Sequence, residues 1–216
     1  MKTAILFDLD GTLLNTLEDL ADATNAALAH FGYPARTLEE IRTFVGNGAK
    51  RQITLSLPEG CSDEVIEQVL AWYKTYYAAH SQCKTRPYEG IVEALADISR
   101  QFPVGIVTNK PDIAVQPLCA AHFPGIYALG ESSRYPRKPA PDMVHAAMEA
   151  VGAEKCIYVG DSEVDVLTAQ NAAVPCLTVL WGFRDRQTLL EAGATHFCET
   201  PAQLLNTLKE MIDNGK

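Results

Sequence analysis

The chain is 216 residues long and has a formal net charge of −9, because 27 Asp and Glu residues outnumber 18 Lys and Arg residues. Hydrophobic residues make up 47% and charged residues 21%, a balance typical of one globular domain, or of a domain with an insertion, and not of a disordered chain. The acidic charge argues against nucleic acids and membranes as partners, and no apolar run approaches the roughly 18 residues needed to cross a bilayer.

The N-terminal segment and the cysteines predict a cytoplasmic protein. Lys2 precedes a short apolar run that Asp8 and Asp10 interrupt, and no small-residue cleavage site follows, so we expect no secretory signal. The six cysteines are scattered and lack metal-binding spacing, which favours reduced thiols over disulfides. They are Cys61, Cys83, Cys119, Cys156, Cys176 and Cys198.

Short apolar runs predict the strands of a parallel sheet that is buried on both faces. These runs lie at residues 4–7, 104–107, 126–129, 156–159 and 176–180, with an edge strand expected at 195–198. Segments of helical periodicity alternate with them, at residues 91–99, 142–151, 164–172 and 203–212. The alternation predicts an α/β fold with a doubly wound, mostly parallel sheet.

The connection between the first two strands predicts a helical insertion. It contains no convincing strand from residue 8 to residue 103, and it is far longer than a crossover requires. Three helix starts are expected in it, two capping boxes at Thr16-x-x-Asp19 and Thr37-x-x-Glu40 and an N-cap at Ser62. We therefore expect an α/β core of residues 1–14 and 86–216, with a small helical cap of residues 15–85 that opens and closes on two tethers.

Three of the predicted strands end in polar residues at the edge of the sheet where ligands bind. The polar runs are Asp8-Leu9-Asp10-Gly11-Thr12, Thr108-Asn109-Lys110 and Gly160-Asp161, the last with Asp165 four residues on. Three carboxylates pointed at one crevice repel one another unless a cation lies between them. Hard oxygen ligands without His or Cys nearby suit Mg²⁺.

The same edge of the sheet suits a phosphate group. Thr108 and Asn109 precede Pro111, a residue favoured at the first position of a helix, so hydroxyl, amide and backbone N–H groups are expected at a helix N-terminus. Lys138 lies just before a second predicted helix and brings an ammonium to the same place. A chain of net charge −9 needs such local groups to bind an anion.

Taken in chain order, these motifs resemble the four motifs of the haloacid dehalogenase-like hydrolases. The residues that carry the resemblance are Asp8-Leu9-Asp10-Gly11-Thr12, Thr108-Asn109, Lys138-Pro139 and Gly160-Asp161-x-x-x-Asp165. The helical insertion is similar to the small cap of that family, so the resemblance covers nearly the whole chain. Residues 44–49 and 86–90 resemble the phosphoglycolate phosphatase group more narrowly, although Asn15 stands where that group usually has an acid.

The resemblance implies a phosphatase that needs Mg²⁺ and forms an aspartyl-phosphate. Asp8 is then the nucleophile, and Asp10 is the general acid and afterwards the base. The implied metal ligands are Asp8, the backbone carbonyl of Asp10, and Asp161, with Asp165 in support. The implied phosphate ligands are Thr108, Asn109 and Lys138.

The substrate is expected to be a small phosphorylated metabolite. The acid at Asp10 favours phosphate chemistry, because dehalogenase and phosphonatase relatives lack it. The predicted first cap helix has no His before His30, which argues against a sugar-phosphate mutase. 2-Phosphoglycolate is the leading candidate, and sugar phosphates, nucleotides and pyrophosphate are alternatives. A signalling module that is phosphorylated on aspartate is the alternative from another class, and Asp10 together with a cap argues against it.

The cap offers fewer specific candidates. Gly46, Asn47 and Arg51 are expected to contact the substrate. Alternatively, residues 46–48 are an ordinary start of a helix and Arg51 is a solvated side chain. An exposed aromatic face on the cap leaves both a monomer and a homodimer open.

Overall fold

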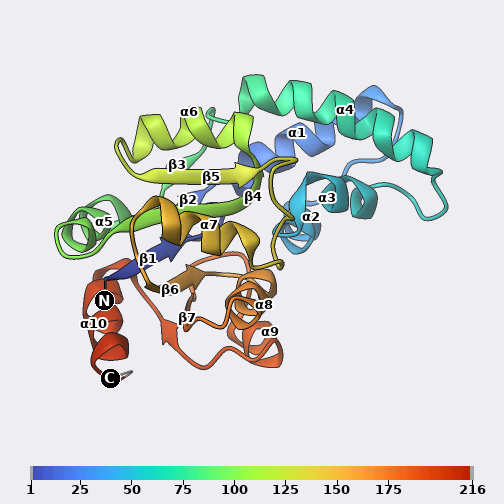
Figure 1. The fold of residues 1–216 in the computed structure, drawn as a ribbon. Coiled ribbons are helices and arrows are strands. Elements are labelled where there is room, and N and C mark those ends of the chain that lie inside the picture. Colours follow the sequence, from blue (N-terminus) through green and yellow to red (C-terminus); the bar gives the residue numbers. More distant parts are fainter. Residues whose placement is uncertain (1, 215–216) are drawn as a thin grey trace.

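The protein, as a computed structural model that describes residues 2–214, is built on a six-stranded sheet (Figure 1). Its strands are β1 (Thr3–Phe7), β4 (Val104–Pro111), β5 (Tyr127–Glu131), β6 (Lys155–Gly160), β7 (Cys176–Val179) and β8 (Phe197–Cys198). They lie in the order β5-β4-β1-β6-β7-β8, and every pairing is parallel. The chain moves outward from β1 through β4 and β5 and then returns to the other side of β1 with β6. The doubly wound sheet is therefore confirmed, and its strand order reverses at β1.

Strand β1 shows why apolar runs without alternation become central strands. Ile5 and Phe7 pack into one apolar cluster and Ala4 and Leu6 into another, and all four side chains are fully buried. Helices α5 (Ile91–Ser99), α6 (Asp112–His122) and α10 (Leu204–Asn214) contribute to the first cluster. Helices α7 (Asp142–Ala150) and α8 (Glu163–Asn171) contribute to the second, so helices cover both faces of the sheet.

The remaining elements near the C-terminus are short. Helix α9 (Arg186–Glu191) places Leu189 in a small apolar cluster with Val166 of α8 and Ala194, and the 3-10 helix η1 (Pro201–Gln203) precedes α10. At the carboxyl end of the sheet lie the loops after the strands and the segment that follows β1.

Four helices follow the first strand, and we call them the helical insertion: α1 (Leu17–His30), α2 (Leu38–Phe44), α3 (Gly48–Ser56) and α4 (Asp63–His80). They share an apolar cluster, to which Ala114 of α6 and Phe183 of the loop after β7 also belong. The insertion is connected to the rest by β2 (Leu14–Asn15) and β3 (Arg86–Pro87), which pair antiparallel. The expectation of no strand here is wrong, because strands of two residues are too short to show any periodicity.

All three expected helix starts are confirmed, because α1 begins directly after Thr16, but only two of the expected caps form. Thr37 and Glu40 form the capping box of α2, and Ser62 accepts a hydrogen bond from the backbone of α4. The capping box expected at Thr16 and Asp19 is wrong. Thr16 makes no capping hydrogen bond, and the Asp19 carboxylate accepts instead from Lys84 N at 3.0 Å and from Thr85 N and Oγ1 at 2.8 Å each. Asp19 therefore joins the start of α1 to the segment just before β3.

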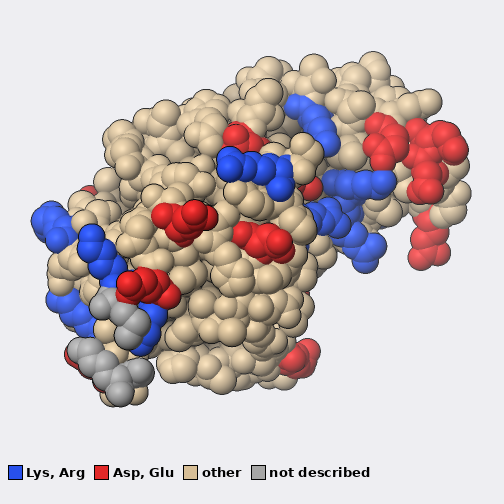
Figure 2. All heavy atoms as spheres, in the orientation of Figure 1, with Lys and Arg blue, Asp and Glu red and all other residues tan. Residues whose placement is uncertain are grey.

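Charge is unevenly distributed over the surface. Figure 2 shows acidic side chains gathered at the tip that carries the start of α4, whereas Lys and Arg side chains gather over α2 and α3. All six cysteines are free thiols, as expected. Within residues 2–214 no helix has the length and apolar character needed to span a membrane.

Candidate active site

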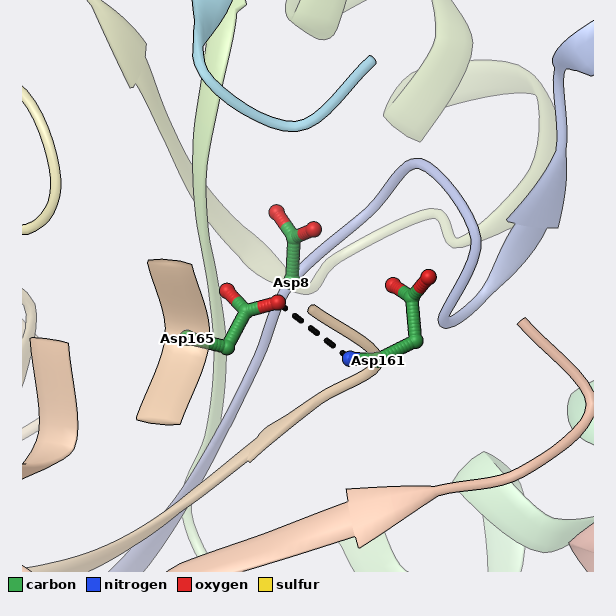
Figure 3. A group of neighbouring side chains, drawn as sticks. All are labelled: Asp8, Asp161 and Asp165. Atoms are coloured by element: carbon green, nitrogen blue, oxygen red, sulfur yellow. Dashed lines mark hydrogen bonds between the residues drawn. The ribbon is translucent and has the colours of Figure 1, made fainter. Parts of the chain in front are cut away.

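Three carboxylates meet at the carboxyl end of the sheet, where its strand order reverses. Asp8 directly follows β1, Asp161 directly follows β6, and Asp165 lies in the first turn of α8. One oxygen from each lies within 4.8 Å of the other two, and Figure 3 shows the three side chains next to one another. Each residue is at most 6% exposed. The structure thus brings together three residues that the sequence placed at one edge.

Asp161 is a buried carboxylate whose hydrogen-bond donors are neutral. Its Oδ1 accepts from the Thr12 hydroxyl at 2.9 Å, and its Oδ2 accepts from Phe183 N at 2.8 Å. Burial, followed by the nearby Asp165 and Asp8 charges, raises the pKa of Asp161 well above its ordinary value. The uncompensated charge is the observation that fits a bound cation.

The backbone next to Asp161 has to be glycine. Gly11 has a φ of +88°, and a Cβ there would lie 2.3 Å from Asp161 Oδ2. A Cβ on Gly182 would lie 2.3 Å from Asp161 Cβ. The turn after β1 and the loop after β7 can therefore enclose the carboxylate only because both positions lack a side chain.

Asp165 is already fully engaged in the structure. Its Oδ2 accepts from Ser162 N at 3.0 Å, Ser162 Oγ at 2.6 Å and Asp161 N at 3.2 Å, the last drawn as a dashed line in Figure 3. Its Oδ1 accepts from Lys138 Nζ at 2.7 Å. Asp165 thus fixes the turn between β6 and α8 and pairs with a lysine, a position that suits a supporting role at a metal better than direct coordination.

Lys138 lies beneath Asp8 and not in the open space above it. Its Nζ donates to Asp8 Oδ1 at 2.8 Å, to Asp165 Oδ1 at 2.7 Å and to the Tyr158 hydroxyl at 2.8 Å, which uses all three of its N–H groups. Burial lowers the pKa of Lys138, but the Asp165 and Asp8 carboxylates outweigh burial and leave the pKa well above its ordinary value. Burial likewise raises the pKa of Asp8 to about 6, against the opposing effect of Lys138.

The predicted phosphate ligands lie at the end of β4. Thr108 lines the cavity described below, together with Asn109. Asn109 Nδ2 donates to Lys138 O at 3.0 Å and to Gly46 O at 3.3 Å, so it connects the end of β4 to the loop before α7 and to the helical insertion. Helix α6 begins only at Asp112, so these two residues belong to the strand end and not to the helix N-terminus that the sequence suggested.

A cavity of about 510 Å³ lies between the sheet and the helical insertion. Asp8, Asp10, Thr108, Asn109 and Lys110 line it from the sheet, and Gly46, Gly48, Ala49, Gln52, Tyr73 and Tyr77 line it from the insertion. Lys138 and Arg51 are not among its lining residues, and Arg51 is exposed on α3. Asn47 is the N-cap residue of α3, so the segment from Gly46 to Gly48 is a helix start as well as a cavity wall.

Two residues at the site were not identified from the sequence. Lys110 Nζ lies 3.0 and 3.3 Å from the two carboxylate oxygens of Asp10 and 2.5 Å from the Tyr77 hydroxyl of α4. Tyr158 accepts from Lys138 and donates to Val107 O at 2.8 Å. Lys110 stands in the polar run Thr108-Asn109-Lys110, but nothing in the sequence indicated that it pairs with Asp10. Tyr158 gave no signal within an otherwise apolar strand.

Comparisons with known proteins agree on one family. A model of the haloacid dehalogenase-like hydrolases matches residues 5–179. Phosphoglycolate phosphatase 1 of Pseudomonas aeruginosa is 31% identical over 219 residues, covering 96% of this chain and 78% of that protein. The phosphoglycolate phosphatase of Photorhabdus laumondii is 31% identical over 227 residues, covering 95% of this chain and 92% of that protein. A crystal structure from Lactobacillus delbrueckii subsp. bulgaricus, provisionally described as a phosphoglycolate phosphatase, matches with a TM-score of 0.91 and 36% identity over 96% of this chain and 99% of that chain.

Proposed function

Since the chain belongs to the haloacid dehalogenase-like hydrolase family and is a phosphatase, we propose that it hydrolyses 2-phosphoglycolate with the help of Mg²⁺. The observation that carries the proposal is the position of Asp8 and Asp10 on the wall of one cavity, beneath the helical insertion. Relatives that are 31% identical over nearly the whole chain are named for that substrate.

The first half-reaction transfers the phosphoryl group to Asp8. A carboxylate oxygen of Asp8 forms a bond to phosphorus while the bond from phosphorus to the leaving oxygen breaks, and Asp10 gives its proton to that oxygen. Lys138, at 2.8 Å from Asp8 Oδ1, keeps the nucleophile ionised and holds its carboxylate in place. The Thr108 hydroxyl binds the phosphoryl oxygens, and Asn109, whose amide N–H groups donate to Lys138 O and Gly46 O, holds the end of β4 in place beside it.

The second half-reaction hydrolyses the aspartyl-phosphate. Asp10, now ionised, takes a proton from a water molecule whose oxygen forms a bond to phosphorus. The bond from phosphorus to Asp8 breaks, inorganic phosphate leaves, and both carboxyl groups return to their starting states. One residue thus serves as acid in the first step and as base in the second.

The acidic side chains fit a divalent cation. Asp8, Asp161 and the backbone carbonyl of Asp10 would hold Mg²⁺, with Asp165 in support, because oxygen ligands without His or Cys suit this ion and Asp161 has neutral donors only. When bound, Mg²⁺ neutralises part of the charge on the phosphoryl oxygens.

We assign residues 15–85 to a cap and residues 1–14 and 86–216 to the catalytic core. The helical insertion packs largely on its own apolar cluster, in which the core is represented by Ala114 and Phe183. A unit of this kind on two short tethers, β2 and β3, can move as a body. Its closure excludes water while the phosphoryl group is transferred.

The test is phosphate release by the purified protein with Mg²⁺, measured on 2-phosphoglycolate, pyrophosphate, sugar phosphates and nucleotides. We expect kcat/KM to be highest for 2-phosphoglycolate, and Asp8→Asn to remove activity on every substrate. Asp63→Asn, at an exposed position in the first turn of α4, is the matched control and keeps the parent activity.

The outcomes separate the parts of the proposal. Similar rates on all substrates would leave a phosphatase without the proposed specificity. Full activity of Asp8→Asn would reject the aspartyl-phosphate. A phosphoprotein that accumulates without releasing phosphate would favour the signalling module instead.

A further inference from the structure

Lys110 places a buried positive charge on the cavity wall beside the general acid. Its side chain is 2% exposed, yet the residue lines the cavity. A lysine in this position is unusual, because burying an ammonium is costly unless it is paired. The mechanism proposed above gives it no task.

The partners of Lys110 come from both sides of the cavity. Its Nζ donates to Asp10, at 3.0 and 3.3 Å, and to the Tyr77 hydroxyl of α4 at 2.5 Å, and it lies 4.6 Å from the centre of the Tyr77 ring. An ammonium has three N–H donors, and here they face three acceptor atoms, the two Asp10 carboxylate oxygens and the Tyr77 hydroxyl. Because two of these acceptors belong to one carboxylate, one N–H can turn to a carboxylate that binds in the cavity while Asp10 keeps another.

The position of the leaving group follows from the role of Asp10. A carboxyl group passes its proton to an oxygen at about 3 Å, so the leaving oxygen has to approach Asp10 to that distance. Lys110 Nζ lies 3.0 Å from the same carboxylate. A substituent on the carbon that bears the leaving oxygen is therefore brought to the ammonium of Lys110.

We propose that Lys110 is the residue that selects a substrate with a carboxylate on the carbon next to the phosphate ester. The inference rests on the proposed phosphatase function and names the group that this site recognises. A carboxylate pairs with the ammonium through a charge-assisted hydrogen bond, which is stronger in a cavity that excludes water than on the surface. A neutral amide accepts a weaker hydrogen bond from the ammonium and leaves its charge less well paired.

The rest of the wall that the insertion contributes holds few charged groups. Leu20, Ala49, Tyr73 and Tyr77 are apolar or carry a single hydroxyl, and Gln52 is an amide. Lys110 is the buried cation of the described wall, whereas Lys74, which also lines it, is exposed. One buried ammonium matches one carboxylate.

The test compares two esters that differ in one charge, 2-phosphoglycolate and its neutral amide, 2-phosphoglycolamide. We expect the parent protein to prefer the carboxylate in kcat/KM by about tenfold to a hundredfold. Lys110→Met should bring this ratio close to one while the amide is still hydrolysed. Lys50→Met, at an exposed lysine of α3 that pairs with Glu67, is the matched control and should keep the ratio of the parent.

A second measurement uses the unaltered protein, in case Lys110→Met does not fold. The methylene phosphonates 3-phosphonopropionate and 3-phosphonopropionamide are compared as competitive inhibitors, and the carboxylate should bind at least about tenfold more tightly. An equal affinity for the two inhibitors would overturn the proposal, as would a Lys110→Met protein that retains the preference for 2-phosphoglycolate.

These outcomes differ from a failure of the proposed function. A parent protein that hydrolyses both esters equally is a phosphatase in which Lys110 does not select the leaving group. A parent protein that hydrolyses neither these esters nor p-nitrophenyl phosphate is not a phosphatase, and both proposals then fail together.

Discussion

Arg42 and Arg184 hold the helical insertion and the sheet together through reciprocal hydrogen bonds. Arg42 of α2 donates to the backbone carbonyls of Phe183 at 3.1 Å and of Gly182 at 3.0 Å. Arg184, in the loop after β7, donates to the carbonyls of Arg42 at 2.8 Å and of Val45 at 2.6 Å. Each guanidinium therefore bonds to the segment that carries the other, and these bonds exist only while the insertion lies on the sheet.

The same loop also holds the acidic cluster. Phe183, whose carbonyl accepts from Arg42, donates its N–H to Asp161 at 2.8 Å. We expect Arg42→Gln and Arg184→Gln each to lower kcat/KM about tenfold, because bonds from a charged donor contribute about 1.5 to 3 kcal/mol when shielded and less at a partly exposed position. Steady-state kinetics on 2-phosphoglycolate measures the loss.

Hydrogen exchange identifies the cause of that loss. If the arginines keep the insertion closed, backbone amides of residues 42–46 should exchange faster in either variant than in the parent. Arg186→Gln is the matched control, because Arg186 lies in the same region but pairs with Glu199 at the surface. Faster exchange in the control than in the parent, or an unchanged exchange rate in the two variants, would contradict the prediction.

Asp19 joins the start of α1 to the segment just before β3, and its loss should destabilise the protein. It is 2% exposed and accepts from two backbone N–H groups and the Thr85 hydroxyl. In Asp19→Ala these donors lose their partner, which costs about 2 to 4 kcal/mol of the free energy of unfolding. Denaturant unfolding followed by circular dichroism measures this loss.

Thr16 provides the contrast. An N-cap threonine is worth about 1 kcal/mol, whereas the Thr16 hydroxyl is buried without a hydrogen-bond partner. We therefore expect Thr16→Val to leave the free energy of unfolding unchanged or to raise it. If Thr16→Val lowered the free energy of unfolding by about 1 kcal/mol, the hydroxyl would be capping α1, as the sequence suggests, and the result would contradict the structure.

The two capping boxes show where sequence patterns predict structure and where they do not. At Thr37 and Glu40 both partners are local, and these exposed side chains meet no distant partner that competes for them, so the pattern sufficed. At Asp19 a distant partner, 66 residues along the chain, took the carboxylate. A local motif is overridden when tertiary contacts offer the same side chain better donors, and spacing alone carries no information about them.

In the site, too, features set by local sequence were predictable and contacts between distant residues were not. The positions of the strands along the chain, and the acids that follow β1 and β6, were predictable because apolar runs and strand ends are local features. The direction of Lys138 was not, because its ammonium is oriented by Tyr158 and by two carboxylates that are 130 and 27 residues away. Contacts made by Lys110 across the cavity depend on how the insertion docks, which no periodicity describes.

Magnesium should stabilise the protein more at neutral than at acidic pH. In the proposed site Mg²⁺ would bind the ionised carboxylates, and the pKa of Asp8 is raised to about 6, so protons would compete with the metal below that pH. With Mg²⁺ at about 100 times its Kd near pH 7.5, we expect about 2.7 kcal/mol of stabilisation and a rise in Tm of about 5 to 10 °C. Near pH 5, about nine tenths of Asp8 is protonated without metal, which raises the apparent Kd about tenfold, and the rise should fall to about half.

Asp161→Asn separates metal binding from a general effect of salt. Because this change removes the carboxylate that has only neutral donors, Mg²⁺ should no longer raise Tm at either pH. Thermal unfolding with and without the metal chelator EDTA gives both values. A larger rise near pH 5 than near pH 7.5 would show that the carboxylates do not hold the metal in ionised form.

Tyr158 should act on catalysis through Lys138. Its hydroxyl accepts from Lys138 Nζ and donates to Val107 O, each at 2.8 Å, and the residue is fully buried. In Tyr158→Phe the carbonyl and the ammonium each lose a partner, so we expect a loss of about 1 to 3 kcal/mol in the free energy of unfolding and a severalfold fall in kcat. Tyr127→Phe, at an exposed position of β5, is the control and should change neither.

A double-mutant cycle decides whether the effect of Tyr158 on kcat passes through Lys138. If Tyr158 only orients the ammonium that holds Asp8, adding Tyr158→Phe to Lys138→Met should lower kcat less than the same change lowers it in the parent. The free energy of unfolding should still fall, because Val107 O loses its donor in either background. Equal falls of kcat in the two backgrounds would mean that Tyr158 affects Asp8 by a route other than the lysine.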